Sequence, residues 1–136
     1  MASCHVVGKV RGLPRPRFAR NGRAYMPDWC EPYKRLIADS YRKQCGGSPY
    51  GGAVEVEIVY RRPLPESRPK AVESEPDTFK PDLDNVAKAV LDALNGVAFE
   101  DDRQVTTLTV KKLPRERGAR EEMFITVKPD TGYKGE

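Results

Sequence analysis

The sequence predicts one compact domain of the mixed α/β (α+β) class over residues 1–136, with a small sheet of about four strands and two main helices. Its 136 residues suffice for one core without disulfide or metal staples. Two segments repeat apolar residues at helical spacing, and several short β-type runs flank them. Three cysteines at wide spacings form no CxxC pair, so we expect reduced thiols: Cys4, Cys30 and Cys45.

The first half of the chain predicts strand, loop, helix and strand. Residues 5–10 have the apolar character of a strand, which ends at two prolines in residues 12–17. The pair Asn21-Gly22 favours a tight turn in the basic loop that follows. Residues 28–44 have the apolar stripe of a helix that ends before Gly46. Its tryptophan and two tyrosines could stack on bases, but aromatic stripes at helical spacing are more often core, and we expect them there. Residues 54–60 largely alternate, as in a strand with one buried face.

The second half predicts a long connection, a second helix and two strands. Four prolines make residues 61–80 irregular, and we expect this connection to be functional or mobile and partly disordered without ligand. A helix then begins near Asp82 and Asp84 and is closed by Gly96. Residues 104–112 and 122–128 are typical of strands, and we expect the charged segment between them to join them as a hairpin.

Charge is divided unevenly along the chain, whose formal net charge is +4. Residues 1–46 carry ten Lys/Arg against three Asp/Glu, whereas residues 81–105 carry two against six. A basic surface attracts polyanions, but an acidic patch repels them unless cations intervene. This division is expected of a metal-assisted reaction on nucleic acid, although an unevenly charged solvated surface would show it too.

Several functional classes are disfavoured. His5 is the only histidine, so a histidine metal cage or a Ser-His-Asp triad is improbable, and we expect it on a strand face. No run approaches the roughly 20 apolar residues of a membrane span, and no signal-peptide pattern is visible. We therefore expect a cytoplasmic protein without a membrane partner.

The acidic segment carries the strongest chemical signal. Asp82 and Asp84 stand at the entrance of the second helix, and a short connection after that helix can bring Asp102 back beside them. Such oxygen ligands suit Mg²⁺, which can bridge carboxylates to phosphate and activate water. Lys88, one turn from Asp84, could neutralise charge that develops on the phosphate.

A structural interpretation of the same residues stays open. Asp82 or Asp84 could be a helix N-cap, Asp84 and Lys88 could form an exposed ion pair, and Asp101 and Asp102 could be turn residues. Neither interpretation is decided by the spacing alone.

The pattern Lys-Pro-Asp-x-Asp-Asn-x-x-Lys-x-x-x-Asp-x-Leu-x-Gly in residues 80–96, followed by Asp-Asp-x-Gln-Val in residues 101–105, resembles that of the RusA-type Holliday junction resolvases. The resemblance implies a Mg²⁺-dependent homodimer, with Mn²⁺ as an alternative ion, that makes paired nicks in four-way DNA junctions during recombination and repair. It implies that Asp82, Asp84 and Asp102 bind metal and that Lys88 supports catalysis. Asp101 is the adjacent candidate for the third acid, and we prefer Asp102.

We accordingly expect a junction-cutting endonuclease of a bacterial or phage-infected cell. The basic loop offers planar guanidinium groups to phosphates, so the residues expected to contact DNA are Arg15, Arg17, Arg20, Arg23 and Lys80. The alternatives are a non-catalytic binding protein for branched DNA, and a small phosphatase, which would need a pocket for a small substrate.

Overall fold

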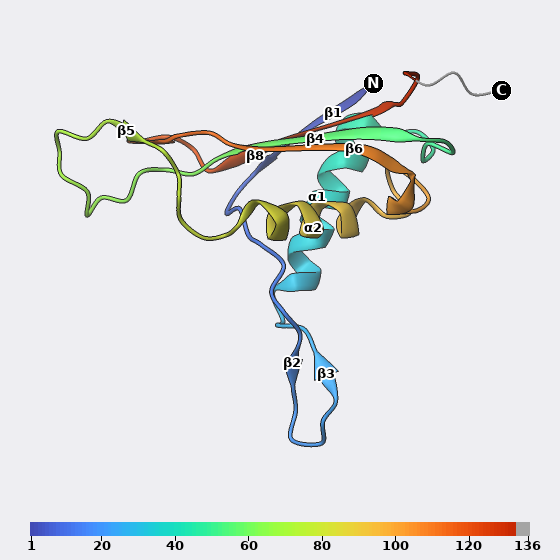
Figure 1. Ribbon diagram of the computed structural model, residues 1–136, viewed down its shortest axis with the longest axis horizontal. Coiled ribbons are helices and arrows are strands. Elements are labelled where there is room, and N and C mark those ends of the chain that lie inside the picture. Colours follow the sequence, from blue (N-terminus) through green and yellow to red (C-terminus); the bar gives the residue numbers. More distant parts are fainter. Residues whose placement is uncertain (133–136) are drawn as a thin grey trace.

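The computed structural model describes residues 1–132 as a four-stranded sheet with both helices on one side (Figure 1). The elements are β1 (Ala2–Val7), β2 (Arg17–Phe18), β3 (Ala24–Tyr25), α1 (Cys30–Cys45), β4 (Val54–Arg61), β5 (Ser74–Glu75), α2 (Leu83–Leu94), the 3₁₀ turn η1 (Asp102–Gln104), β6 (Val105–Lys112), β7 (Arg115–Glu116) and β8 (Glu122–Pro129). The predicted class, a single α+β domain with two helices and a mixed four-stranded sheet, is confirmed. The end of the predicted domain, residues 133–136, lies outside the described residues.

The main sheet has the order β1-β8-β4-β6. β8 runs antiparallel to both of its neighbours, whereas β4 and β6 are parallel. Parallel neighbours need a crossover connection, and α2 lies within the one between β4 and β6. The crossover therefore runs along α2, with the start of this helix at one end and the turn before β6 at the other (Figure 1).

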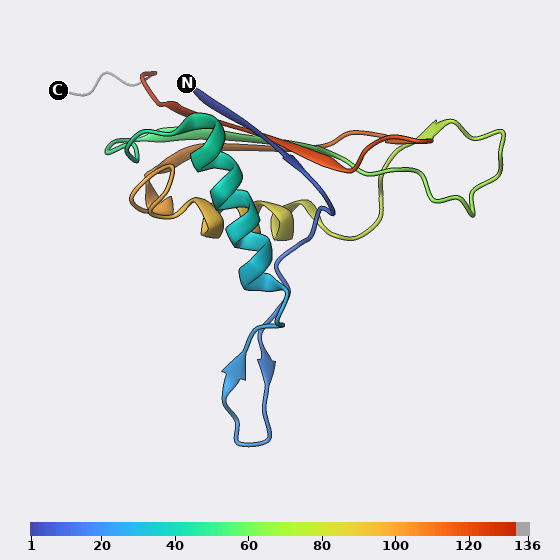
Figure 2. The same cartoon turned by 180° about the vertical axis from the view of Figure 1, so that it is seen from behind.

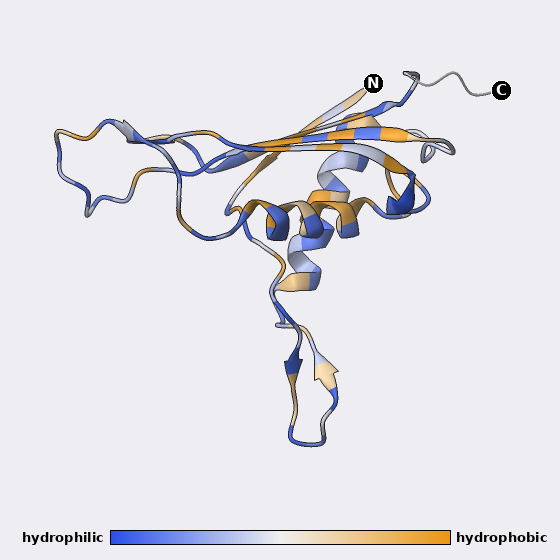
Figure 3. Ribbon diagram, viewed as in Figure 1, coloured by the Kyte–Doolittle hydropathy of each residue, from blue (hydrophilic) through white to orange (hydrophobic). Residues whose placement is uncertain are grey.

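The core lies between the sheet and the two helices (Figure 2). Alternate residues of β4 are buried, as the sequence predicts. The apolar side of α2 is buried through Val86, Val90 and Leu94, and Figure 3 shows hydrophobic residues along this helix and along the central strands. In α1, Tyr33 and Tyr41 belong to the core, which confirms the expectation for these aromatics.

The predicted hairpin of the last two long strands is wrong. β4 lies between β6 and β8, so these two strands are not neighbours. β4 has a neighbour on each side and buries every second residue on the face that packs against the helices, whereas β6 is the edge strand and is largely exposed. The segment between β6 and β8 instead extends outward and pairs through β7 with β5.

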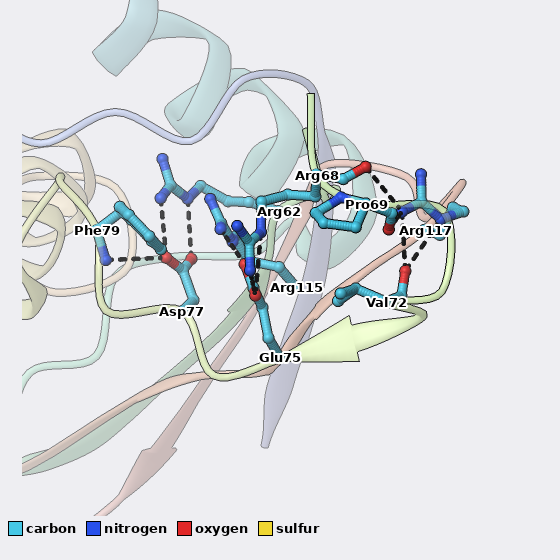
Figure 4. A network of polar contacts seen from close by, with 9 residues as sticks. All are labelled: Arg62, Arg68, Pro69, Val72, Glu75, Asp77, Phe79, Arg115 and Arg117. Carbon is cyan, nitrogen blue, oxygen red and sulfur yellow. Dashed lines mark hydrogen bonds and ion pairs between the residues drawn. The ribbon is translucent and has the colours of Figure 1, made fainter. Parts of the chain in front are cut away.

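The connection over residues 61–80 is irregular, as predicted, but the structure does not bear out the expected disorder. Arg62 forms a two-fold hydrogen bond with Asp77, with both donor–acceptor distances at 2.9 Å, and Arg115 and Arg68 both bond Glu75 (Figure 4). Arg117 donates to backbone carbonyls of the same connection. These contacts hold the connection against the segment around β7.

β2 and β3 form a short ribbon that projects away from the sheet and helices (Figure 1). Its tip contains the predicted turn, where the Gly22 N–H donates to the Ala19 carbonyl and Gly22 has a φ of 81°. We call residues 17–25 the arm. The basic loop is thus a projecting ribbon rather than a loop lying on the surface.

Three smaller expectations can be compared with the structure. β1 begins and ends three residues earlier than predicted, because the chain leaves the sheet at Gly8, with a φ of 136°. His5 does lie on a strand face, hydrogen-bonded to Glu122 at 2.7 Å and stacked on Phe124. The three cysteines are free thiols. In the part of the chain that the structure describes, none of the helices has the length and apolar character needed to span a membrane.

Candidate active site

Two of the predicted catalytic acids, Asp82 and Asp84, lie at the start of α2. Asp82 occupies the N-cap position of this helix, but its side chain makes no capping hydrogen bond. Asp84 and Lys88 are exposed, and no ion pair joins them among the contacts of residues 1–132. The structural interpretation of these three residues as cap and ion pair is therefore not supported.

Asp84 and Lys88 line a surface hollow of about 260 Å³ together with Asp92 and Asp102, which we call the acidic hollow. The apolar part of its wall is Ala87 and Leu91 from α2 and Leu108 from β6. Asp102 thus shares a hollow with Asp84, as the sequence suggested, but not with Asp82. Three carboxylates here face one ammonium group.

Asp101 and Asp102 have different environments despite being adjacent. The Asp101 carboxylate accepts a hydrogen bond from the Arg103 N–H at 2.9 Å and forms a capping box with Gln104, and its pKa is lowered chiefly by that backbone hydrogen bond. Partial desolvation, followed by the Asp101 and Asp92 carboxylates, raises the pKa of Asp102. Asp101 therefore stabilises the turn, whereas Asp102 faces other acids and gains most from a nearby cation.

The donor set suits a hard divalent cation, although it does not enclose one. Carboxylate oxygens are the ligands that Mg²⁺ prefers, and a cation would offset both the desolvation and the neighbouring carboxylates that raise the pKa of Asp102. Within residues 1–132, no three His, Cys, Asp or Glu side chains converge closely enough to hold a metal ion. The residues fit an ion that one or two carboxylates bind and that water and phosphate oxygens complete, as is usual for Mg²⁺.

Asp82 does not line the acidic hollow but a larger neighbouring one of about 630 Å³, which we call the basic hollow. This hollow lies between the segment that follows β1 and the segment that precedes α2. Asp82 is its single acid, and Asn85 and Trp29 also line it. Its cationic side chains are Lys9, Arg11, Arg15, Arg62 and Lys80.

The predicted DNA-contacting residues lie along one path. Arg15 and Lys80 line the basic hollow, while Arg17, Arg20 and Arg23 are exposed on the arm that leads away from it. The arm also exposes two aromatic side chains, Phe18 at 72 % and Tyr25 at 48 %. The path starts beside Asp82 and runs outward along the arm.

Sequence reasoning did not assign a site role to several residues that line these hollows. Asp92 was seen only as part of the polar side of the helix, although its spacing from Asp84 and Lys88 already put it on their face. No local pattern indicates Lys9 or Arg62, because only tertiary packing brings their loop and strand connection together. For Trp29 the sequence offered base stacking as an alternative to the core, and the structure leaves it half-buried in the lining of the basic hollow.

Comparisons with known proteins agree with this arrangement. A family model described as "Endodeoxyribonuclease RusA" matches residues 8–128, which include both hollows and the arm. A similar curated protein, "Uncharacterized protein YqaN" of Bacillus subtilis (strain 168), is 33 % identical over 136 aligned residues, covering 90 % of this chain and 94 % of the relative.

Proposed function

Because this chain belongs to the RusA family of endodeoxyribonucleases, we propose that it resolves four-way (Holliday) DNA junctions by two symmetric nicks in a reaction that depends on Mg²⁺. The proposed metal ligands are Asp82, Asp84 and Asp102, with Lys88 as the supporting basic residue. Recombination and repair in a bacterial or phage-infected cytoplasm are the proposed setting.

The observation that carries the proposal is the pair of adjoining hollows with opposite charge. Asp82 and Asp84 are two residues apart on the chain, yet one lines the basic hollow and the other the acidic one. A phosphodiester attracted by the basic hollow would lie beside carboxylates, which is favourable only with a cation between them. A nuclease that uses a divalent metal needs this juxtaposition.

Each proposed residue has a role that follows from its position. Asp84 and Asp102 both line the acidic hollow and would bind the metal there, whereas Asp82, two residues before Asp84, lines the basic hollow and would complete the ligand set only by turning its side chain toward Asp84. When bound, Mg²⁺ would supply water activation and stabilisation of the charge on the phosphate. The Lys88 ammonium group lines the same hollow and would attract the phosphate oxygens.

A homodimer is part of the proposal. A four-way junction is roughly two-fold symmetric, so two symmetric cuts call for two active sites related by a two-fold axis. The proposed DNA contacts on each protomer are Arg15, Arg17, Arg20, Arg23 and Lys80.

The decisive experiment compares a labelled synthetic four-way junction with a linear duplex of the same sequence, each with Mg²⁺, Mn²⁺ or EDTA. We expect metal-dependent cuts at symmetric positions in the junction and none in the duplex. Tight junction binding without cuts in either metal would replace the proposal with a non-catalytic binding protein for branched DNA.

Asp84→Asn tests the metal site. The change removes a ligand and a charge that repels phosphate, so we expect cleavage to fall at least about 100-fold while junction affinity stays equal or rises. Cleavage in Mg²⁺ and binding by gel shift in EDTA measure the two effects. A parallel loss of binding, with a lower free energy of unfolding, would instead indicate a structural role for Asp84.

A further inference from the structure

We propose that the basic hollow is a binding site for a single unpaired nucleotide, whose base stacks at Trp29 and whose phosphate is held by Lys9, Arg15 and Lys80. The inference rests on the proposed function for its substrate class, DNA with unpaired or unstacked bases at a branch point. It adds a base-binding site to the contacts that hold the DNA backbone. Its support comes from the walls, the charge and the aromatic side chain of the hollow.

The walls of the hollow are held firmly. On one side the Val10 N–H donates to the Glu121 carboxylate at 2.6 Å, and the Arg11 N–H donates to the Tyr33 hydroxyl at 3.1 Å. On the other side the Leu13 N–H donates to the Asn85 carbonyl at 3.0 Å, which ties this segment to the first turn of α2. A site whose walls are already ordered loses little conformational entropy when a ligand binds.

The aromatic element of the hollow is Trp29, which is half-buried just before α1. The Arg11 guanidinium carbon lies 4.7 Å from the centre of its ring, and Tyr33 packs edge-on against it. Unstacked bases bind proteins by stacking on aromatic rings and on guanidinium planes, and this cluster offers both. The indole ring can stack on an unpaired base, whereas the sugar–phosphate backbone of a duplex has no flat ring to stack on it.

The charge of the hollow suits the phosphate of that nucleotide. Lys9, Arg15 and Lys80 line it without a carboxylate partner among the ion pairs of residues 1–132. Its volume of about 630 Å³ lies in the range of pockets that enclose small ligands. The acidic hollow next to it is smaller, at about 260 Å³, and carries three carboxylates, so the nucleotide has one favourable place.

The test uses the fluorescence of Trp29, which is the only tryptophan of the chain. The full-length protein in EDTA is titrated with an oligothymidylate of about ten nucleotides and with an oligomer of the same length and charge built from abasic sugars. We expect the oligothymidylate to quench the fluorescence and to bind about tenfold more tightly, because only it can stack a base. Equal affinities without quenching would overturn the proposal.

Variants then locate the stacking, using a labelled oligomer and fluorescence anisotropy. Trp29→Leu should abolish the difference in affinity between the two oligomers, and Trp29→Phe should restore part of it. Phe18→Leu is the matched control, since Phe18 is an exposed aromatic on the basic arm. If Phe18→Leu abolishes the difference and Trp29→Leu does not, the base stacks on the arm and the proposal is wrong.

A charge variant separates the phosphate from the base. Lys9→Gln should weaken the binding of both oligomers by the same factor, whereas a loss of affinity confined to the oligothymidylate would contradict the assignment of Lys9 to phosphate.

None of these binding measurements depends on whether the protein cleaves DNA. Base-dependent quenching by a protein that cuts no junction would refute the proposed function alone, and symmetric junction cutting without base dependence would refute the nucleotide site alone.

Discussion

At the scale of single residues, the adjacent acids Asp101 and Asp102 differ in their hydrogen bonds and in their surroundings. Asp101 accepts from the backbone of the turn that it caps, so its oxygens are engaged. Asp102 lines the acidic hollow and lies close enough to Asp92 for the two charges to interact. The structure thereby favours Asp102 over Asp101 as the third metal ligand.

Asp102→Asn and Asp101→Asn should therefore differ. We expect Asp102→Asn to reduce Mg²⁺-dependent cleavage at least about 100-fold with little change in stability. Asp101→Asn should retain most cleavage, because an asparagine oxygen can also cap the turn. Junction cleavage and urea unfolding of both variants check this expectation. A greater loss of cleavage in Asp101→Asn than in Asp102→Asn would instead assign the metal-ligand role to Asp101 and the turn-capping role to Asp102.

Gly12 is the second residue whose position matters to the site. A Cβ on it would lie 2.8 Å from the Cβ of Pro81 and 2.9 Å from that of Asn85, so no side chain fits without separating the two walls of the basic hollow. The loop after β1 approaches α2 closely only because this residue is glycine.

We expect Gly12→Ala to lower the free energy of unfolding by about 1–3 kcal/mol and to weaken oligothymidylate binding. Gly51→Ala is the control, since a Cβ there meets no atom within 4 Å and its φ is not positive. Urea unfolding and anisotropy measure both effects. If both variants have the same unfolding free energy and the same affinity for oligothymidylate, the two walls of the basic hollow can move apart without loss of stability.

At the scale of elements, the ion pair of Arg62 and Asp77 holds the connection that leads into α2. The Asp77 side chain is 1 % exposed, and it also accepts from the Phe79 N–H at 3.3 Å, just before Lys80-Pro81-Asp82 begins to shape the site. Burial opposes ionisation of Asp77, but the hydrogen bonds from Arg62 and the Phe79 N–H outweigh it and lower its pKa. The pair therefore positions the segment that carries Asp82, the first of the proposed metal ligands.

Asp77→Asn should lower the free energy of unfolding by about 1–3 kcal/mol at neutral pH, because it leaves the Arg62 charge without its partner. Asp39→Asn, in the exposed pair with Arg42, should change it by less than about 0.5 kcal/mol. Because the folded pKa of Asp77 is lowered, its contribution is present above the unfolded pKa of about 3.9 and is lost as pH falls through the folded value. The difference in free energy of unfolding between wild type and Asp77→Asn should therefore shrink below about pH 4. A difference in unfolding free energy that does not change with pH would refute this.

At the scale of the whole molecule, the basic side chains form a path that starts beside Asp82 and runs outward along the arm. The arm projects from the body, and its arginines are exposed (Figure 1). Exposed arginines on a projecting ribbon add little to folding, yet each that meets a phosphate releases counterions from the DNA. The arm should thus affect binding and not stability.

The double variant Arg20→Gln/Arg23→Gln tests the arm. We expect the slope of log affinity against log salt for junction binding to decrease by about 0.9 for each phosphate that the variant no longer neutralises. The free energy of unfolding of this variant should change by less than about 0.5 kcal/mol. Lys43→Gln/Lys128→Gln removes the same charge from α1 and β8 and should leave the slope nearly unchanged. Equal slopes for both double variants would show that the arm does not bind DNA.

The sequence by itself determined the two helices, the alternating strand β4, the turn at Asn21-Gly22 and the acids from Asp82 to Asp102. These features depend on periodicity, turn preference and charge among residues that are close along the chain. Tertiary structure alone decided that β4 separates β6 from β8, that Asp82 and Asp84 line different hollows, and that Trp29 and Arg62 meet beside them. Those outcomes depend on which faces are buried together, and contacts between distant segments leave no pattern in either segment alone.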